Sequence, residues 1–306
     1  MSEKLLIVGG TGFIGNALAH AAVASGLFVT ILSLNKPLVE IDGVKYIQAN
    51  VSDVCQLKSH LKCSSFEFVV NLSGYVDHRD FLLGGREIID VHFNGVGNIL
   101  EAIDWSVLKR FVQIGSSDEY GNIKAPQTEG VRELPISPYS LAKLSSTHLL
   151  EMLYRVHKLP VVIFRLFLVY GPAQKENRFL PQIINGCLRR EKILATSGMQ
   201  IRDFCYIDDV IRGIMLSFTN NNINGEVINL AAGEPLTVRS MVEKVRDEIG
   251  HGEIKFGGRE YRRGENMELY ANIAKANELL GWRPLVAIEE GLINTISYYK
   301  HSDYGE

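Results

Sequence analysis

The chain lacks the features that mark nucleic-acid-binding, membrane-spanning and zinc-binding proteins. Its formal net charge is −3, so we expect no nucleic-acid partner. No apolar run reaches the roughly 18 residues of a spanning helix, so we expect no membrane partner. The four cysteines show neither a CxxC pattern nor a Cys/His ligand spacing. We therefore expect free buried thiols, no metal and a cytoplasmic location. An apolar run that begins at Leu5 predicts a strand at once and leaves no room for a secretory signal.

What the chain does have is apolar material for a large core. Apolar residues make up 46% of its 306 residues and charged residues 22%, which suits one or two closely packed domains. The segment 4–15 reads KLLIVGGTGFIG. Its uninterrupted apolar run is typical of a strand buried on both faces of a parallel sheet. A helical pattern follows over about 16–25 and a second apolar strand over 27–32. The glycines therefore lie in a strand–turn–helix–strand context.

This glycine turn predicts a dinucleotide-binding site. The N-terminus of a helix offers N–H groups and a positive dipole end to a pyrophosphate. Missing side chains let the backbone approach the phosphate oxygens, and the third glycine lets the helix pack on its strand. The alternative is a glycine turn that serves only the geometry of the fold. The residues expected to contact the cofactor are Gly9, Gly12, Phe13, Ile14 and Gly15.

The end of the second strand bears on which dinucleotide is bound. Enzymes that use NAD usually place an acidic side chain here for the adenosine ribose hydroxyls. This chain has Ser33, Asn35 and Lys36 instead, with no acid. Hydroxyl, amide and ammonium groups can all hold a phosphate. We therefore expect NADP or NAD, with NADP slightly favoured; a solvated polar loop is the alternative.

Further apolar runs predict a doubly wound parallel sheet. We expect strands over 45–48, 66–72, 110–115 and 161–169. The residues after the third and fourth strands lie where such sheets bind a dinucleotide. They are Asn50 and Val51, then Leu72, Ser73 and Gly74.

The long patterns between these runs predict helices. Asp53 is expected to cap a helix that begins near Val54. A long helix is expected over 85–103, with His92 inside it and His78 before it. Neither histidine has a partner at metal-ligand or triad spacing, so we expect structural or surface histidines. The remaining patterns predict helices over 139–157, 179–190, 210–219, 238–248 and 274–280, and a strand over 227–230.

Three residues can carry acid–base chemistry on an alcohol. Ser116 follows the fifth strand, and Tyr139 and Lys143 lie one turn apart on one helical face. Tyr139 can exchange a proton with the alcohol if its pKa falls from about 10. The charge of Lys143 would favour the phenolate, and Ser116 could donate to the reacting oxygen. The alternative is an incidental surface pair.

Together these motifs resemble the extended short-chain dehydrogenase/reductase superfamily, in its group of nucleotide-sugar epimerases, dehydratases and 4-ketoreductases. The resemblance is carried by GGTGFIG, Ser116, the 139–143 pentapeptide, RLFLVYGP, QIRDFCYIDD, and RRGE followed by GWRP. It implies an α/β Rossmann-type domain over 1–172 plus about 204–232. It also implies a smaller α/β domain over 173–203 and 233–306 for the nucleotide sugar, and a homodimer.

The resemblance also implies contacts with the substrate. Arg202 and Arg262 would bind its diphosphate, because a guanidinium fork matches two phosphate oxygens. Leu168 stands where these enzymes commonly have an asparagine, so Asn177 or Arg178 would replace that contact. His92 also stands where an asparagine is common.

The residues after Ser116 bear on the type of reaction. Dehydratases of this group carry an acidic pair directly after the catalytic hydroxyl residue. Here Ser117 and Asp118 follow Ser116, so the acidic pair is displaced and dehydration is disfavoured. Asp118 is then an auxiliary group in the substrate site, and Glu119 a structural or solvated carboxylate.

The stretch GSSDEYG is most similar to reductases of GDP-4-keto-6-deoxy sugars, and QIRDF to reductases of CDP-sugars. We therefore expect an oxidoreductase of polysaccharide biosynthesis that acts at C4 of a GDP-, CDP- or dTDP-linked sugar, as a 4-ketoreductase or 4-dehydrogenase. A 4-epimerase with tightly bound NAD is the alternative. A 4,6-dehydratase and a non-catalytic dinucleotide sensor are less favoured.

Overall fold

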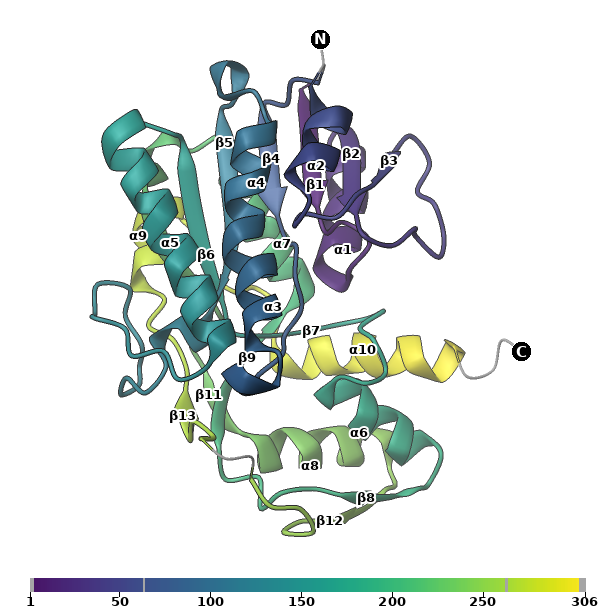
Figure 1. The fold of residues 1–306 in the computed structure, drawn as a ribbon. Coiled ribbons are helices and arrows are strands. Elements are labelled where there is room, and N and C mark those ends of the chain that lie inside the picture. Colours follow the sequence, from purple (N-terminus) through teal and green to yellow (C-terminus); the bar gives the residue numbers. More distant parts are fainter. Residues whose placement is uncertain (1–2, 63, 262–263, 303–306) are drawn as a thin grey trace.

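A seven-stranded parallel sheet forms the centre of the molecule. The computed structural model describes residues 3–62, 64–261 and 264–302. The strand order is β10-β6-β5-β4-β1-β2-β3, the order of a doubly wound Rossmann sheet. The strands are β1 (Lys4–Val8), β2 (Phe28–Ser33), β3 (Lys45–Gln48), β4 (Phe68–Asn71), β5 (Arg110–Ser116), β6 (Val161–Leu166) and β10 (Glu226–Leu230). Figure 1 shows the six strands from β6 to β3 side by side. The expected α/β class and parallel sheet are confirmed.

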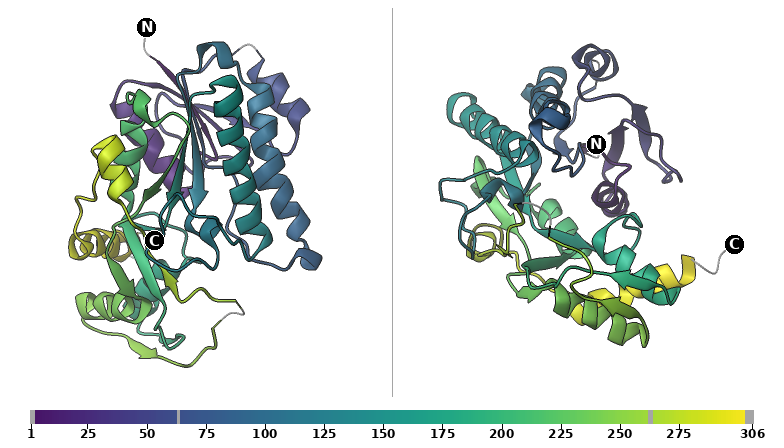
Figure 2. Two further views of the ribbon diagram at one scale, coloured as in Figure 1. Left: turned by 90° about the vertical axis from the view of Figure 1, so that its left-hand side faces the viewer. Right: turned by 60° about the horizontal axis from the view of Figure 1, so that its bottom comes forward.

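Alternate residues of β1 point to opposite faces of the sheet, and both faces are covered by helices. Leu5 and Ile7 pack with α1 (Phe13–Ala24) and α7 (Ile207–Leu216). Figure 2 shows helices on both sides of the sheet. Leu6 packs in a second core with residues from helices of the other face. Those helices are α2 (Val54–Leu61), α3 (Gly85–Ile89), α4 (Gly95–Ala102) and α5 (Pro138–His157). This double burial explains the uninterrupted apolar run.

The helix expected over 85–103 contains a π-helical turn. This turn, η2 (Asp90–Asn94), joins α3 to α4 and contains the buried His92. Single π-helical turns widen a helix locally and are frequent at functional sites. The N-cap of α2 is confirmed, because the Asp53 side chain accepts a hydrogen bond from the backbone N–H of Gln56.

The single strand expected over 161–169 is wrong. β6 ends at Leu166, and β7 (Leu168–Tyr170) leaves the central sheet to pair with β9 (Ile201–Tyr206). The break falls at Phe167, which is buried in a small separate core. An unbroken apolar pattern cannot show to which sheet each half belongs. The second sheet also contains β11 (Pro235–Thr237) and β13 (Glu268–Leu269).

The remaining elements lie mostly below the central sheet in Figure 1. Three helices pack together there: α6 (Phe179–Leu188), α8 (Val238–Ile249) and α10 (Ile288–Ser302). The sequence did not lead us to expect α10. The pair β8 (Lys192–Leu194) and β12 (Glu253–Lys255) completes this region, and α9 (Ala274–Leu280) packs near β10. Short 3-10 turns are η1 (Phe81–Leu83), η3 (Trp105–Val107), η4 (Ser117–Tyr120) and η5 (Asn221–Ile223).

Two expectations from composition can be compared with this fold. Cys187 and Cys205 are free and buried, but Cys55 is exposed on α2, so the expected burial is wrong for that thiol. Cys63 lies outside the described residues. Among the residues that the structure describes, no helix has the length and apolar character to cross a membrane.

Candidate active site

A large cleft opens at the carboxyl ends of the central strands. Its volume is about 1250 Å³, and its lining comes from both the central sheet and the C-terminal region. Carboxyl ends of parallel strands are where open α/β sheets bind ligands. Sequence-predicted site residues that line it are Gly9, Gly12, Phe13, Ile14, Gly15, Leu72, Ser73, Gly74, Ser116, Ser117, Asp118, Tyr139, Lys143, Asn177, Arg178 and Arg202.

The glycine turn leaves the N-terminus of α1 open toward this cleft. Gly9 has a φ of 82°, and a Cβ there would lie 2.7 Å from the carbonyl oxygen of Leu72. A Cβ on Gly15 would lie 2.5 Å from the Cα of Gly10. Gly12 is the N-cap of α1, and no side chain caps its N–H groups. This cradle fits a dinucleotide pyrophosphate, which needs close backbone approach and free helix N–H groups.

The polar residues after β2 and β3 do not line the cleft. The Ser33 hydroxyl accepts a hydrogen bond from the backbone N–H of Thr11 at 3.2 Å, so it braces the glycine turn. Asn35 and Lys36 are exposed beyond it. Asn50 instead orders its own loop, because its Oδ1 accepts from the Ser52 N–H. Val51 is buried beneath α4, where a Cβ on Gly95 would lie 3.1 Å from its Cγ2.

Ser116, Tyr139 and Lys143 meet in the cleft. Tyr139 is held by a well-formed helix start: Ser137 caps α5 by accepting the Ser140 N–H, and Pro138 occupies the first turn. Lys143 donates from Nζ to the Ile114 carbonyl oxygen at 2.8 Å. Burial raises the pKa of Tyr139, and an interaction with the Ser116 hydroxyl partly offsets this rise.

The expectation that Lys143 brings down the pKa of Tyr139 is wrong. Burial raises the pKa of Tyr139 above its usual value, and the nearby charge of Asp118 raises it further. The ammonium of Lys143 is directed to the Ile114 carbonyl instead. Burial also lowers the pKa of Lys143 to about 8, against the charge of Glu119, which raises it. Loss of water around each side chain therefore dominates its ionisation.

Two histidines flank the ring of Tyr139, which sequence reasoning did not anticipate. The His92 ring lies edge-on with a centroid distance of 5.0 Å, and the His78 ring with one of 5.5 Å. His92 also hydrogen-bonds the Tyr75 carbonyl oxygen at 2.8 Å, and burial lowers its pKa to about 3. His78 Nε2 lies 3.8 Å from Asp118 Oδ2. The one available signal was His92 in the place of a common asparagine.

The predicted substrate contacts come from several elements. Ser117 and Asp118 belong to η4, directly after Ser116. Arg178 is the N-cap of α6; burial raises the pKa of Tyr139, and the charge of Arg178 slightly offsets that rise. Arg202 on β9 forms an ion pair with Glu265. Arg262 lies outside the described residues.

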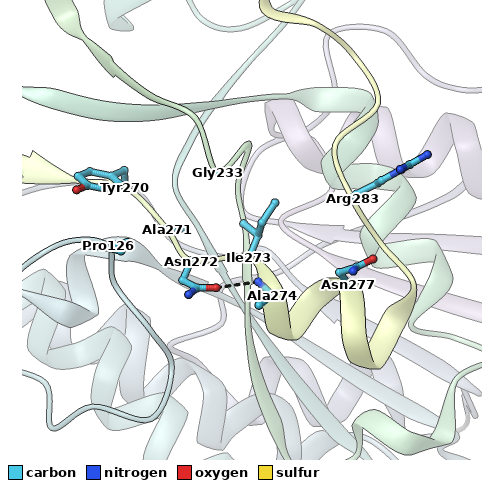
Figure 3. Close-up of a pocket in the computed structure, with 9 residues that line it drawn as sticks. All are labelled: Pro126, Gly233, Tyr270, Ala271, Asn272, Ile273, Ala274, Asn277 and Arg283. Carbon is cyan, nitrogen blue, oxygen red and sulfur yellow. Dashed lines mark hydrogen bonds between the residues drawn. The ribbon is translucent and has the colours of Figure 1, made fainter.

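A second, smaller pocket of about 600 Å³ is shown in Figure 3. The Asn272 side chain within it accepts a hydrogen bond from the Ala274 N–H at 2.9 Å, at the start of α9. None of the sequence-predicted site residues lines this pocket. Throughout 3–62, 64–261 and 264–302, no cluster of three His, Cys, Asp or Glu side chains could hold a metal ion. The chemistry suggested by the sequence therefore belongs to the large cleft.

The family model described as "NAD dependent epimerase/dehydratase family" matches residues 5–231. The chain is 28% identical to the UDP-glucuronate 4-epimerase of Thermodesulfobacterium geofontis, over 97% of this chain and 96% of that protein.

Solved structures give the same likeness in three dimensions. A structure of an epimerase from Methanothermobacter thermautotrophicus superposes with a TM-score of 0.90 at 24% identity, over 99% of this chain and 94% of that one. The UDP-glucuronic acid 4-epimerase of Bacillus cereus, in complex with UDP-glucuronic acid and NAD, gives 0.86 at 27% identity, over 98% and 99%.

Proposed function

Because the chain belongs to the NAD dependent epimerase/dehydratase family, we propose that it is a nucleotide-sugar 4-epimerase that uses NAD. Membership makes it an oxidoreductase-type enzyme of the short-chain dehydrogenase/reductase superfamily. One observation carries the proposed reaction: Ser116, Tyr139 and Lys143 line the same cleft as the glycine turn. A sugar hydroxyl at Tyr139 therefore lies in the cavity that also offers a dinucleotide site.

The side chains of this cleft can move the proton that oxidation of a sugar alcohol releases. Tyr139, once deprotonated, accepts the proton of the C4 hydroxyl, and the Ser116 hydroxyl donates to the same oxygen. Lys143 contributes a buried ammonium to the same cleft. Bound NAD supplies the hydride acceptor and a positive charge that favours the phenolate. The 4-keto sugar would then turn its other face to the cofactor, and return of the hydride to C4 with return of the proton from Tyr139 to the C4 oxygen would give the C4 epimer and restore NAD.

The residues of the glycine turn are suited to hold NAD. The open N–H groups after Gly12 would bind the pyrophosphate. Leu72, Ser73 and Gly74 line the cleft at the end of β4, and Gly74 has a φ of 101° that favours glycine. NAD is favoured over NADP because the Bacillus cereus 4-epimerase was solved with NAD.

The proposed substrate is a UDP-linked sugar. Two relatives named for UDP-glucuronate 4-epimerisation, one at 28% and one at 27% identity, support this class. The guanidinium groups of Arg178 and Arg202 line the cleft and suit a diphosphate. The dTDP-, GDP- and CDP-linked sugars expected from sequence motifs are competitors to be tested beside it.

A second candidate is the 4-ketoreductase that the sequence motifs favoured. The specific observation behind it is the end of β2, where Ser33 is followed by exposed Asn35 and Lys36 and by no carboxylate. Such a loop tolerates the extra phosphate of NADP. A reductase consumes NADPH and exchanges the whole cofactor at each turnover. The comparisons favour the epimerase over this reading.

Cofactor content and product stereochemistry distinguish the two candidates. For the epimerase, denatured protein should release NAD, detected by mass spectrometry. Proton NMR of UDP-glucuronate or UDP-glucose incubated with the protein should show a second, C4-inverted sugar. Tyr139→Phe should bind the same ligands and form no product. NADPH oxidation with a 4-keto sugar nucleotide, without epimerisation, would replace the proposal with the reductase.

A further inference from the structure

Glu119 lies beneath the proposed catalytic residues and is fully buried. Its Oε1 accepts a hydrogen bond from the backbone N–H of Ser116 at 2.8 Å. Its Oε2 accepts one from the Thr147 hydroxyl and one from Arg165 Nε, both at 2.8 Å. Three donors, one of them a guanidinium, satisfy this carboxylate as a buried anion. Glu119 is therefore not a solvated carboxylate; it is a buried one that holds three hydrogen-bond donors in place.

These bonds join the two elements that carry the triad. Ser116 ends β5, whereas Tyr139 and Lys143 belong to α5. Thr147 follows Lys143 by four residues, so all three α5 side chains lie on one face of the helix. One oxygen of Glu119 thus holds the strand end and the other holds the helix face. The contact fixes how far Ser116 lies from the tyrosine and lysine.

Gly115 provides the space for this carboxylate. A Cβ at position 115 would lie 2.5 Å from Glu119 Oε1, too close for any side chain. The strand therefore requires glycine directly before Ser116 as long as Glu119 occupies this site. This relationship gives a physical reason for the stretch Gly115–Glu119 as a unit.

We propose that Glu119 is a positioning residue of the triad, which sets the separation between Ser116 and the Tyr139–Lys143 pair and holds a fixed negative charge beneath them. The inference rests on the proposed function, because it assigns Glu119 a role in that same proton transfer. Glu119 itself does not line the cleft. It acts on the reaction through the residues that it holds.

The electrostatic part of this role has a definite sign. The charge of Glu119 raises the pKa of Tyr139 and the pKa of Lys143, in each case as a smaller effect than burial. Removing the charge therefore lowers both pKa values. The charged and titratable groups around Glu119 are Arg165 on β6, Tyr139 and Lys143 on α5, Asp118 and Tyr120 on η4, and Glu133 across Arg165.

Glu119→Gln tests the proposal with a matched control. We expect kcat/KM to fall on the order of tenfold to a hundredfold, because small misplacements of reacting groups cost this much. Both limbs of its pH profile should also move to lower pH, since the tyrosine and the lysine both lose protons more readily. Glu133→Gln removes a carboxylate from the same arginine, at 2.7 Å, but touches neither Ser116 nor α5. The Glu133→Gln control should therefore leave the pH profile of kcat/KM unchanged.

Two further variants separate geometry from charge. Gly115→Ala displaces the carboxylate, and Thr147→Val removes its hydrogen bond to α5, while both keep the negative charge. Each variant should lower kcat. Each should also shift the pH profile of kcat/KM less than Glu119→Gln does. If the Glu119→Gln protein fails to fold, Thr147→Val still tests the positioning role of Glu119. Wild-type kcat in both variants would overturn the positioning role.

Titration of Lys143 tests the charge without any turnover. Its rate of acylation as a function of pH, followed by mass spectrometry, reports its pKa in the wild-type protein and in both glutamine variants. A lower Lys143 pKa in Glu119→Gln alone supports the proposal, and identical titrations in all three overturn it. Absence of activity on every sugar nucleotide would refute the proposed function and leave this readout intact.

Discussion

Lys143 donates a hydrogen bond from Nζ to the carbonyl oxygen of Ile114 at 2.8 Å. This contact ties helix α5 to strand β5 within the cleft. Lys143 is also buried, which lowers its pKa to about 8. The Lys143 ammonium therefore loses its proton within the pH range of ordinary assays.

Activity should fall as the pH rises through about 8. Below this pKa the Lys143 ammonium keeps its proton and its hydrogen bond; above it, the charge is lost. The profile of kcat/KM between pH 6 and 10 measures this. Lys143→Arg, whose guanidinium stays protonated throughout, should be slower and should lack this alkaline limb. An unchanged limb in that variant would assign the titration to another group.

Gly9→Ala should destabilise the protein and weaken dinucleotide binding. The position combines a φ of 82° with a Cβ contact of 2.7 Å to backbone. Left-handed backbone in an alanine costs about 1–3 kcal/mol, and the clash adds to it. Gly26→Ala is the control, because its φ is 80° and a Cβ there meets no atom within 4 Å. Urea unfolding and NAD titration should separate the two effects, with only Gly9→Ala losing affinity.

His92 should make the fold less stable as the pH falls below about 6.5. Burial holds its folded-state pKa at about 3, below the ordinary histidine pKa of 6.5. Between these values the unfolded chain binds a proton that the folded chain does not, so the unfolding free energy decreases toward acid, by up to about 1.4 kcal/mol per pH unit. Unfolding free energies at pH 5 and 7 measure the slope. His92→Asn should reduce it, and an equal slope would contradict this account.

Asp209→Ala should loosen the segment before α10. Asp209 is buried and accepts hydrogen bonds from the backbone N–H groups of Leu285 and Val286 at 2.9–3.0 Å, and from Arg212 at 2.7 Å. Loss of these acceptors leaves buried donors without partners, which should cost about 2–4 kcal/mol of unfolding free energy. Asp208→Ala, at the exposed neighbour, should change stability by less than about 0.5 kcal/mol. Equal effects would refute the assignment.

Local patterns sufficed for most of the central sheet. Buried strands leave long apolar runs, and the glycine turn adds a backbone requirement visible in the sequence, so β1, β3 and the end of α1 could be predicted closely, whereas α1 begins earlier than expected, at Phe13. The N-cap Asp53 is another local signal. Such features depend on residues near each other in the chain.

Features that depend on distant contacts were missed. The break between β6 and β7 follows from pairing with β9, more than thirty residues later. The burial of Tyr139, which reverses the expected direction of its pKa, depends on the elements that close around it. His78 and His92 reach that ring from a loop and from a π-helical turn. None of these placements leaves a periodic trace in the sequence.

The departure of β7 from the central sheet also affects how the chain can be assembled. β10 completes the edge of that sheet, yet it follows β9 in the chain, which belongs to the other sheet. Neither sheet can therefore be finished during synthesis until both have received strands from the last hundred or so residues. We expect the two parts to fold as one cooperative unit, and a fragment that ends at Pro172 to lack both β10 and α7 from its core.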